Sequence, residues 1–239
     1  MSVYFQVKLF QLREQMRVIC RYYRNVRFAL VDLGFCFFAF FFNPYRICRK
    51  FTGTHSYGET PITTFAELAK AADLTKEDVF VDLGSGRGKL CFWASSWIGC
   101  DCRGVEQVPG LVRLSQWLAW AFRVPVRFDQ EKLETADLSH ATVVYLYTME
   151  WDETLLLEMQ PGARVITVGS PVDLEGFAVV KRIEARYPWG VADVFIQQRI
   201  AQFMPIEEDS GELFGRMKGS IHVLEDILAP IDEVWDASR

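Results

Sequence analysis

The feature that most constrains this 239-residue chain is the segment Val-Asp-Leu-Gly-Ser-Gly-Arg-Gly-Lys-Leu at residues 81–90. An apolar run leads into Asp82, and glycines then alternate at Gly84, Gly86 and Gly88 before a predicted helix. Glycine lets a ligand approach a backbone turn because no Cβ intervenes, and N–H groups at the following helix N-terminus can contact that ligand. Because Asp82 repels anions, the turn favours a ligand with a positive centre or with hydroxyl and amine donors.

Two commoner glycine-rich motifs do not fit this segment. A dinucleotide-binding turn has the pattern G-x-G-x-x-G, but here the third glycine comes one residue early and Lys89 stands in its place. The phosphate-binding loop G-x-x-x-x-G-K-[ST] would need a glycine instead of Leu83 and a serine or threonine instead of Leu90. Both motifs are therefore excluded, and the pattern that remains is D-x-G-x-G-x-G.

This remaining pattern resembles the first motif of class I S-adenosylmethionine-dependent methyltransferases. The resemblance implies that S-adenosylmethionine is the cofactor and that the motif supplies its contacts. These contacts are Asp82, Gly84, Ser85, Gly86 and Gly88. The alternative is a tight turn between a strand and a helix that binds no ligand.

Further cofactor contacts are implied at the ends of the next two strands. A strand predicted at residues 102–105 ends at Glu106, about 20 residues after the motif, where an acid accepts hydrogen bonds from ribose hydroxyls. We carry this role over to Glu106 and a cofactor contact to its neighbour Gln107. An acid just past the third strand commonly receives the adenine amino group in this family. Asp129 and Glu131 both qualify, and we favour Glu131 by its spacing to the next strand.

The apolar runs predict a sheet. The clearest is residues 141–147, an apolar run between polar segments that is typical of a buried parallel strand. Strands are expected at residues 79–81, 102–105, 124–128, 141–147, 164–168, 177–183 and 191–199. The resemblance implies an α/β fold: a Rossmann-like doubly wound sheet of seven strands with a C-terminal antiparallel hairpin, preceded by an N-terminal helical and apolar segment.

A loop upstream of the glycine motif narrows the resemblance. By itself Tyr-Gly-Glu-Thr at residues 57–60 predicts a turn and a helix start, with Thr60 or Thr64 as the cap. The tetrapeptide resembles that of the non-SET histone lysine methyltransferases, the disruptor-of-telomeric-silencing type, where such a loop closes over the methionine end of the cofactor. The likeness covers residues 57–171 and implies cofactor contacts from Tyr57, Glu59 and Thr60.

The chain departs from that family where the chemistry takes place. After the fourth strand the family carries Asn-Asn-Phe near the target lysine, whereas this chain has Tyr147, Thr148 and Met149. Histone specificity is therefore not carried over, and the candidate catalytic residues are Tyr57, Tyr147 and Thr148. Burial of a lysine acceptor in an aromatic channel disfavours its charged form. Tyr57, Tyr147, Met149 and Trp151 are available either for such a channel or for the core.

The two ends of the chain differ sharply in charge. Residues 1–52 hold nine Lys and Arg against two Asp and Glu, whereas residues 203–239 hold three against nine. Five of the N-terminal arginines are spaced to form one stripe on a single helix; they are Arg13, Arg17, Arg21, Arg24 and Arg27. Residues 28–42 follow with one charge, Asp32, and seven phenylalanines.

Three interpretations of residues 28–42 compete. We favour membrane association, either spanning or interfacial, with the basic stripe held to anionic lipid. The second is a core helix that packs on the catalytic domain. The third, a signal peptide, is excluded because no small-residue cleavage site follows. The small membrane-anchored lysine methyltransferases of organelles and bacteria, which this chain also resembles, carry a similar apolar segment before the catalytic domain.

These observations predict three parts and a leading function. Residues 1–52 are expected to form a basic amphipathic helix with an apolar membrane-associated segment, residues 53–202 the methyltransferase domain, and residues 203–239 an acidic, partly helical tail.

The six cysteines show no C-x-x-C spacing, so no metal site is expected. Nucleic acid is not expected as a partner, because the net charge is −5 and a phenylalanine run adjoins the basic arm.

The leading function is N-methylation of a lysine in a protein substrate, at the cytoplasmic face of a membrane. Methylation of a lipid or small amine is one alternative, and a non-catalytic cofactor-binding interaction module is another. For the location, the alternative is a soluble cytoplasmic protein.

Overall fold

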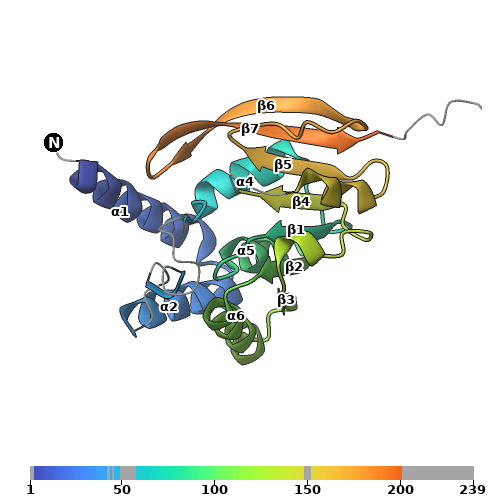
Figure 1. The fold of residues 1–239 in the computed structure, drawn as a ribbon. Coiled ribbons are helices and arrows are strands. Elements are labelled where there is room, and N and C mark those ends of the chain that lie inside the picture. Colours follow the sequence, from blue (N-terminus) through green and yellow to red (C-terminus); the bar gives the residue numbers. More distant parts are fainter. Residues whose placement is uncertain (1–2, 42–43, 45, 49–57, 148–151, 201–239) are drawn as a thin grey trace, which may run out of the picture. The chain divides into compact units, whose positions relative to one another are not determined.

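A seven-stranded sheet forms the centre of the structure, a computed structural model that describes residues 3–41, 44, 46–48, 58–147 and 152–200 (Figure 1). The strand order is β3-β2-β1-β4-β5-β7-β6. Strands β1 to β5 are parallel, and β7 runs antiparallel to both β5 and β6. The bounds are β1 Val79–Leu83, β2 Asp101–Glu106, β3 Val126–Gln130, β4 Val143–Leu146, β5 Arg164–Val168, β6 Phe177–Tyr187 and β7 Gly190–Arg199. The Rossmann-like sheet and its C-terminal hairpin are confirmed, with β3 starting two residues later than expected.

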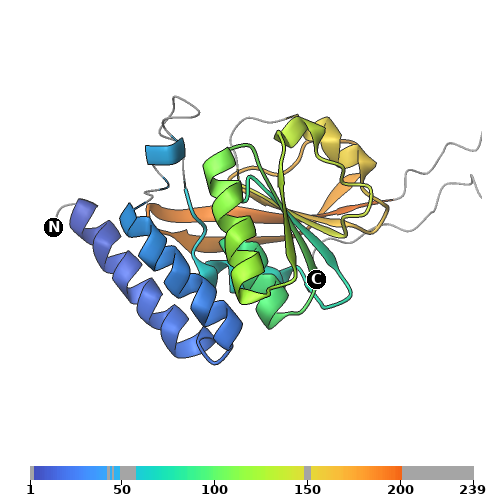
Figure 2. The same cartoon turned by 90° about the horizontal axis from the view of Figure 1, so that it is seen from below.

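The two faces of the sheet are covered differently (Figure 2). Helices α4 (Ile62–Ala71), α5 (Lys89–Trp97) and α6 (Pro109–Phe122) lie on one face, where Phe65, Phe80 and Phe92 are fully buried in one core cluster. The short 3-10 helices η1 (Leu133–Thr135) and η2 (Glu153–Glu158) lie on the other. Leu156 and Met159 pack there in a second cluster with residues of β1, β2 and β4. Both faces are therefore buried, as a parallel sheet requires.

Two N-terminal helices, α1 (Val3–Tyr22) and α2 (Val26–Phe41), pack on the helical face. Asn25 separates them: its Oδ1 accepts a hydrogen bond from the Phe28 N–H at 3.1 Å, and its amide donates to the Ser96 carbonyl at 2.6 Å. Asparagine is a strong N-cap, so a new helix starts here. The expected single arginine stripe is therefore wrong: Arg13, Arg17 and Arg21 lie on α1, Arg24 lies in the turn, and Arg27 lies on α2.

Helix α2 packs on α5 and α6 of the helical layer, in agreement with the second interpretation of residues 28–42. Phe28, Val31 and Phe35 are buried, and the Phe35 ring lies 5.6 Å from that of Phe92 on α5. Among the described residues, no helix combines the length and the apolarity needed to cross a membrane. The expected transmembrane helix is corrected accordingly. The expected acidic tail at residues 203–239 lies outside the described residues.

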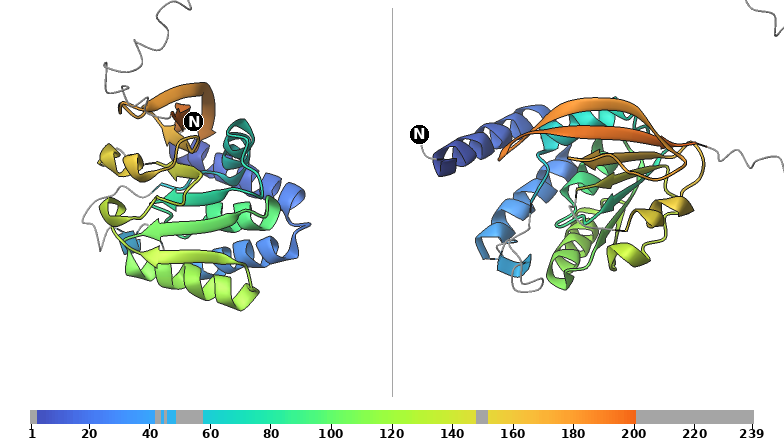
Figure 3. Two further views of the ribbon diagram at one scale, coloured as in Figure 1. Left: turned by 90° about the vertical axis from the view of Figure 1, so that its right-hand side faces the viewer. Right: turned by 45° about the horizontal axis from the view of Figure 1, so that its top comes forward.

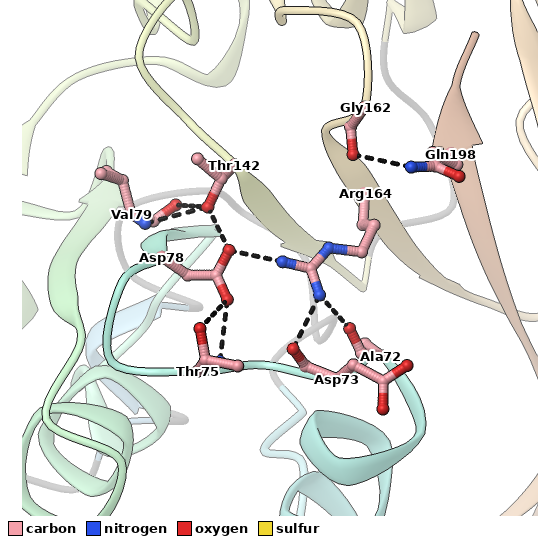
Figure 4. A network of polar contacts seen from close by, with 9 residues as sticks. All are labelled: Ala72, Asp73, Thr75, Asp78, Val79, Thr142, Gly162, Arg164 and Gln198. Carbon is pink, nitrogen blue, oxygen red and sulfur yellow. Dashed lines mark hydrogen bonds and ion pairs between the residues drawn. The ribbon is translucent and has the colours of Figure 1, made fainter.

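A polar network ties the strands together at their amino ends (Figure 4). Asp78 precedes β1, Thr142 precedes β4, and Arg164 opens β5. The Asp78 carboxylate accepts hydrogen bonds from Thr142 Oγ1 at 2.7 Å and from Thr75 N at 2.8 Å, and it pairs with the Arg164 guanidinium. Burial opposes ionisation of Asp78, but these hydrogen bonds and the Arg164 charge outweigh it and hold its pKa below the usual range.

We expect the substitution Asp78→Asn to lower the free energy of unfolding at pH 7 by about 2–4 kcal/mol, because it leaves a partly buried guanidinium without its partner. A carboxyl group whose pKa is lower in the folded state stabilises the fold at pH values above its unfolded pKa. This contribution is lost as the pH falls. The difference between variant and wild type should therefore shrink below the ordinary carboxyl pKa of 3.8. Urea unfolding at pH 7 and at acidic pH measures the free-energy difference between variant and wild type under both conditions. The control is Asp193→Asn, which breaks an exposed ion pair with Arg182 and should have little effect; equal losses would contradict the role of Asp78.

Candidate active site

The glycine turn after β1 is held against β2 by its own backbone. Gly84 and Gly86 have φ values of +77° and +56°, which favour glycine. Gly84 N and Ser85 N both donate to the Val105 carbonyl at 2.9 Å, and Gly86 N donates to Glu106 Oε2 at 2.9 Å. The backbone N–H groups of these three residues are therefore used within the fold. The surface that faces a ligand is therefore formed by side chains, and the glycines leave room beside it because they carry no Cβ.

Most of the expected cofactor contacts line one pocket at the carboxyl end of β1. Tyr147, a candidate catalytic residue, also lines it, at the end of β4. The expected contacts in its wall are Glu59, Thr60, Asp82, Gly84, Ser85 and Gly86. Gly88 is not part of this wall; it is the N-cap of α5 and packs against the Phe128 ring. Tyr57 and Thr148, like Met149 and Trp151, lie outside the described residues.

Two buried polar groups of this pocket suit a ligand with positive and hydrogen-bonding groups. Asp82 is 3% exposed, and burial together with the nearby Glu106 charge raises its pKa to about 8. A cation bound beside it would restore the ionised form. Ser85 Oγ is buried and has no hydrogen-bond partner among the described residues. Buried polar atoms are normally satisfied, so this hydroxyl is available to a ligand.

Glu106 and Gln107 follow the same sheet edge but do not line the pocket. The two Glu106 carboxylate oxygens accept hydrogen bonds from Gly86 N and Val108 N, each at 2.9 Å. Burial raises the pKa of Glu106, while these backbone hydrogen bonds act to lower it. Gln107 is exposed. Glu106 therefore connects the glycine turn to the end of β2, and its contact with a ribose remains a proposal.

The two acids at the end of the third strand are both paired with Arg103, which no sequence motif singled out. Arg103 Nε lies 2.5 Å from Asp129 Oδ2, and Arg103 Nη2 lies 3.0 Å from Glu131 Oε2. Asp129 belongs to β3, and Glu131 follows its last residue. An adenine amino group at Glu131 would therefore share the carboxylate with a guanidinium, and this contact also remains a proposal.

Three aromatic rings stand beside the pocket. The Tyr147 ring centroid lies 5.6 Å from that of Tyr187, and Tyr187 is stacked on Trp189 at 5.3 Å. Tyr187 ends β6 and Trp189 lies in the turn to β7, so the hairpin supplies two of the three rings. Figure 3 shows this hairpin reaching toward α1. No sequence motif marked Trp189 as a site residue.

A second cavity of about 350 Å³ adjoins the pocket and is called the side cavity here. It shares Glu59, Thr60 and Tyr147 with the pocket. From there it extends between α1, α2 and the tip of the β6–β7 hairpin, and Phe10, Asp32, Phe35 and Trp189 line this part. A ligand in the pocket and a second molecule in the side cavity would therefore meet near Tyr147.

The buried Asp32 links α2 to the glycine turn. Its Oδ2 accepts hydrogen bonds from Gln15 Nε2 and from the Tyr23 hydroxyl, both at 2.9 Å. Lys89 Nζ lies 3.6 Å from Asp32 Oδ1 and 3.8 Å from Glu59 Oε2. The N-terminal helices are thus connected electrostatically to the pocket. The only sequence signal for this cluster was a lone acid in an apolar run.

Comparison with known proteins identifies the class. The family model described as "Histone methylation protein DOT1" matches residues 45–144. The RNA methyltransferase from Salinibacter ruber, solved in complex with S-adenosyl-L-homocysteine, is 26% identical with a TM-score of 0.52, over 60% of this chain and 95% of that chain. The chain is a class I S-adenosylmethionine-dependent methyltransferase.

The fold of this methyltransferase is also similar to that of TrmN from Thermus thermophilus. The two are 18% identical with a TM-score of 0.50, over 64% of this chain and 53% of that chain. A search of curated proteins gave no significant match. The pocket residues fit S-adenosylmethionine, because the buried Asp82 and the unpartnered Ser85 hydroxyl are complementary to a ligand with a cationic centre and hydrogen-bonding groups.

Proposed function

We propose that this methyltransferase N-methylates a lysine side chain of a protein. The observation that carries the proposal is the side cavity, which opens from the pocket and has aromatic rings at Tyr147 and Trp189. A lysine side chain offers an apolar stem to such rings and an amine to the end near the cofactor. The match of residues 45–144 to a family of histone methylation proteins supports a protein substrate.

The cofactor, when bound, supplies a methyl group carried on a positively charged sulfonium. We propose that Asp82 and Ser85 hold its polar groups together with Glu59 and Thr60, which line the same pocket. Thr60 is itself positioned by a 2.6 Å hydrogen bond to the buried Tyr145 hydroxyl. The remaining contacts proposed from the resemblance are Tyr57, Gly84, Gly86, Glu106, Gln107 and Glu131.

The acceptor amine must be neutral to accept a methyl group, and a lysine in water has a pKa of about 10.4. We propose that the rings of Tyr147 and Trp189 exclude water from the amine and so lower its pKa. Burial raises the pKa of Tyr147 above its ordinary value, so its hydroxyl stays protonated at neutral pH. The hydroxyl can then accept a hydrogen bond from the amine and orient it, but it does not act as a base. Thr148 and Tyr57 remain proposed participants.

A second candidate function is methylation of a small amine or of a lipid head group. The volume of the side cavity, about 350 Å³, lies within the range of small-molecule sites. The same rings would lower the pKa of such an amine as they would that of a lysine. The product therefore distinguishes the two candidates.

The test is label transfer from methyl-labelled S-adenosylmethionine to a whole lysate that includes membranes. Label traced to a protein lysine by mass spectrometry is the expected result. Label in a lipid or small molecule would support the second candidate, and label in RNA would contradict both. Cofactor binding without any transfer would instead support a non-catalytic interaction module.

The variant Trp189→Ala should lower kcat/KM for the identified acceptor by at least about tenfold, because it removes one wall of the side cavity. Cofactor affinity should stay unchanged, since Trp189 does not line the pocket. Val180→Ala is the control, because Val180 is exposed on the same hairpin, outside both cavities. Equal activity of the two variants would show that the side cavity is not part of the acceptor site.

A further inference from the structure

We propose that a groove beside α1 binds an acidic segment of the protein substrate, next to the lysine that is methylated. The inference deepens the proposed function and rests on it, because it names a feature of the protein that carries the lysine. The groove has a volume of about 870 Å³, larger than the side cavity. We call it the arginine groove after the charged residues that line it, which are Arg13, Arg17, Arg21, Glu67, Glu184 and Arg186.

Three elements form the arginine groove. Helix α4 contacts both α1 and β6, and it lies between them in Figure 1. On α1, Arg13, Arg17 and Arg21 recur every four residues, about one helical turn, so they share one side of the helix. On β6, Glu184 and Arg186 are two residues apart and therefore share one face of the strand. The fold thus brings arginines from two distant segments of the chain to one groove.

The guanidinium groups of the groove are not neutralised by nearby carboxylates. Within the part of the chain that the structure describes, Arg13, Arg17 and Arg186 make neither an ion pair nor a side-chain hydrogen bond, and all three are exposed. The Glu14 carboxylate, which also lines the groove, accepts hydrogen bonds from Thr63 N at 2.9 Å and from Thr63 Oγ1 at 2.6 Å. An acidic ligand would therefore supply the anions that these arginines lack.

The arginine groove adjoins the proposed lysine site. Phe10 and Glu14 line both the groove and the side cavity, and the side cavity reaches Tyr147 beside the cofactor pocket. Along α1 the path from Phe10 to Arg21 is about 16 Å, at 1.5 Å per residue. An extended peptide covers this length with about five residues, at roughly 3.3 Å each. A substrate whose lysine occupies the side cavity can therefore lay its neighbouring residues along the arginines.

The pattern of charges favours carboxylate side chains over a nucleic-acid backbone. Arginine binds carboxylates through two parallel hydrogen bonds. Glu67 and Glu184 are exposed among the arginines and would repel a continuous row of phosphates. The acids of a peptide are separate groups that can pair with the arginines alone. Sites for single-stranded nucleic acid also use several aromatic rings for stacking, whereas Phe10 is the only aromatic residue in the described lining of the groove.

Fluorescence anisotropy with the full chain tests the proposal. The probe is a labelled peptide with a lysine, a short glycine–serine spacer and about five glutamates, the number that spans the arginines. A second peptide carries glutamines in place of the glutamates, and each is made in both chain directions. We expect the glutamate peptide to bind at least about tenfold more tightly at low salt and to lose this advantage as the salt concentration rises.

Charge reversal locates the binding site. The double variant Arg13→Glu and Arg17→Glu should weaken binding of the glutamate peptide at least about tenfold, because repulsion replaces attraction. The matched control, Arg27→Glu and Arg113→Glu, makes the same change of charge at exposed residues that line none of the three cavities. Its affinity should change by less than about twofold, since screening weakens distant charges. Circular dichroism and S-adenosylhomocysteine binding check that both variants are folded, since none of the four changed residues lines the pocket.

Two binding results would overturn the proposal. One is equal affinity for the glutamate and glutamine peptides, or equal weakening by the two folded double variants. The other is tighter binding of a single-stranded RNA of about ten nucleotides that only the Arg13 and Arg17 variant loses, which would assign the groove to nucleic acid.

These binding measurements involve no methyl transfer, so they fail or succeed independently of the label-transfer test of the proposed function. Label found only in a lipid or small molecule would refute the lysine function and, with it, the role of the groove in substrate binding, even if the peptide binds. For an identified protein acceptor, the Arg13 and Arg17 variant should raise KM at least about tenfold and leave kcat unchanged, because the groove lies away from the reacting atoms. An unchanged KM would contradict the proposal.

Discussion

Replacing Asp82 with asparagine is expected to weaken S-adenosylhomocysteine binding by about 10- to 100-fold, because a buried carboxylate that pairs with the ammonium group of the ligand is worth about 1.5–3 kcal/mol. Asp82 lies near the end of β1, lines the pocket and is 3% exposed, so solvent cannot replace its charge. Isothermal titration calorimetry measures the effect directly. Unchanged affinity would mean that the ligand does not contact Asp82, and the assignment of the pocket would fail.

The affinity of the wild-type enzyme should also depend on pH. Without ligand the pKa of Asp82 is raised to about 8 by burial and by the Glu106 charge, so the carboxyl is mostly neutral at pH 6 to 7. The ammonium group of the ligand favours the ionised form of Asp82, and binding then releases a proton. Affinity should therefore rise with pH up to about 8 and become level above it. In Asp82→Asn the slope should disappear, whereas Glu106→Gln, which keeps Asp82, should retain it.

The same substitution is expected to stabilise the enzyme when no ligand is bound. The carboxyl has a pKa of 3.8 when unfolded and about 8 when folded, so the unfolded state binds fewer protons between these values. Stability of the wild type therefore falls as the pH rises through this window. Asparagine cannot ionise and should raise the melting temperature most at pH 8. A lower melting temperature of ligand-free Asp82→Asn would show that Asp82 is structural.

The residue pattern predicted the strands, and the resemblance to class I methyltransferases predicted the centre of the pocket. Apolar runs separated by polar segments marked all seven strands. The glycine motif and the tetrapeptide at residues 57–60 stand far apart in the sequence, yet Glu59, Thr60, Asp82 and Ser85 line one pocket. They meet because the glycine turn and the end of β4 lie at the same edge of a parallel sheet, where such folds bind their ligands.

The parts that could not be predicted depend on contacts between distant segments. The phenylalanine run of residues 28–42 has the composition of a membrane anchor, and it is the burial of Phe28, Val31 and Phe35 against the rest of the fold that distinguishes it from one. The pairing of Glu131 with Arg103 is equally invisible, because it requires β2 and β3 to be neighbours. The same holds for Trp189, whose place beside Tyr147 depends on the course of the β6–β7 hairpin.

The third glycine of the motif is expected to be required by the fold rather than by the cofactor. Gly88 has a φ of +73°, and a Cβ built there would lie 2.2 Å from the Phe128 ring. Gly99 has a similar φ of +85° but no atom within 4 Å of such a Cβ. We expect Gly99→Ala to cost about 1–2 kcal/mol of unfolding free energy for backbone strain alone. Gly88→Ala should cost at least about 3–5 kcal/mol, because the ring must also move.

Replacing Phe128 tests whether a clash with its ring explains the loss of stability expected for Gly88→Ala. Its ring also lies 2.6 Å from a Cβ built at Gly104 in β2, so it packs on the backbone on both sides. Adding Phe128→Leu to Gly88→Ala should therefore recover part of the loss, and a double-mutant cycle by urea unfolding measures the coupling. A folded double variant that binds S-adenosylhomocysteine like wild type would assign Gly88 to packing. If that variant folds but does not bind, the sequence expectation that Gly88 contacts the cofactor is right, and the clash explanation is insufficient.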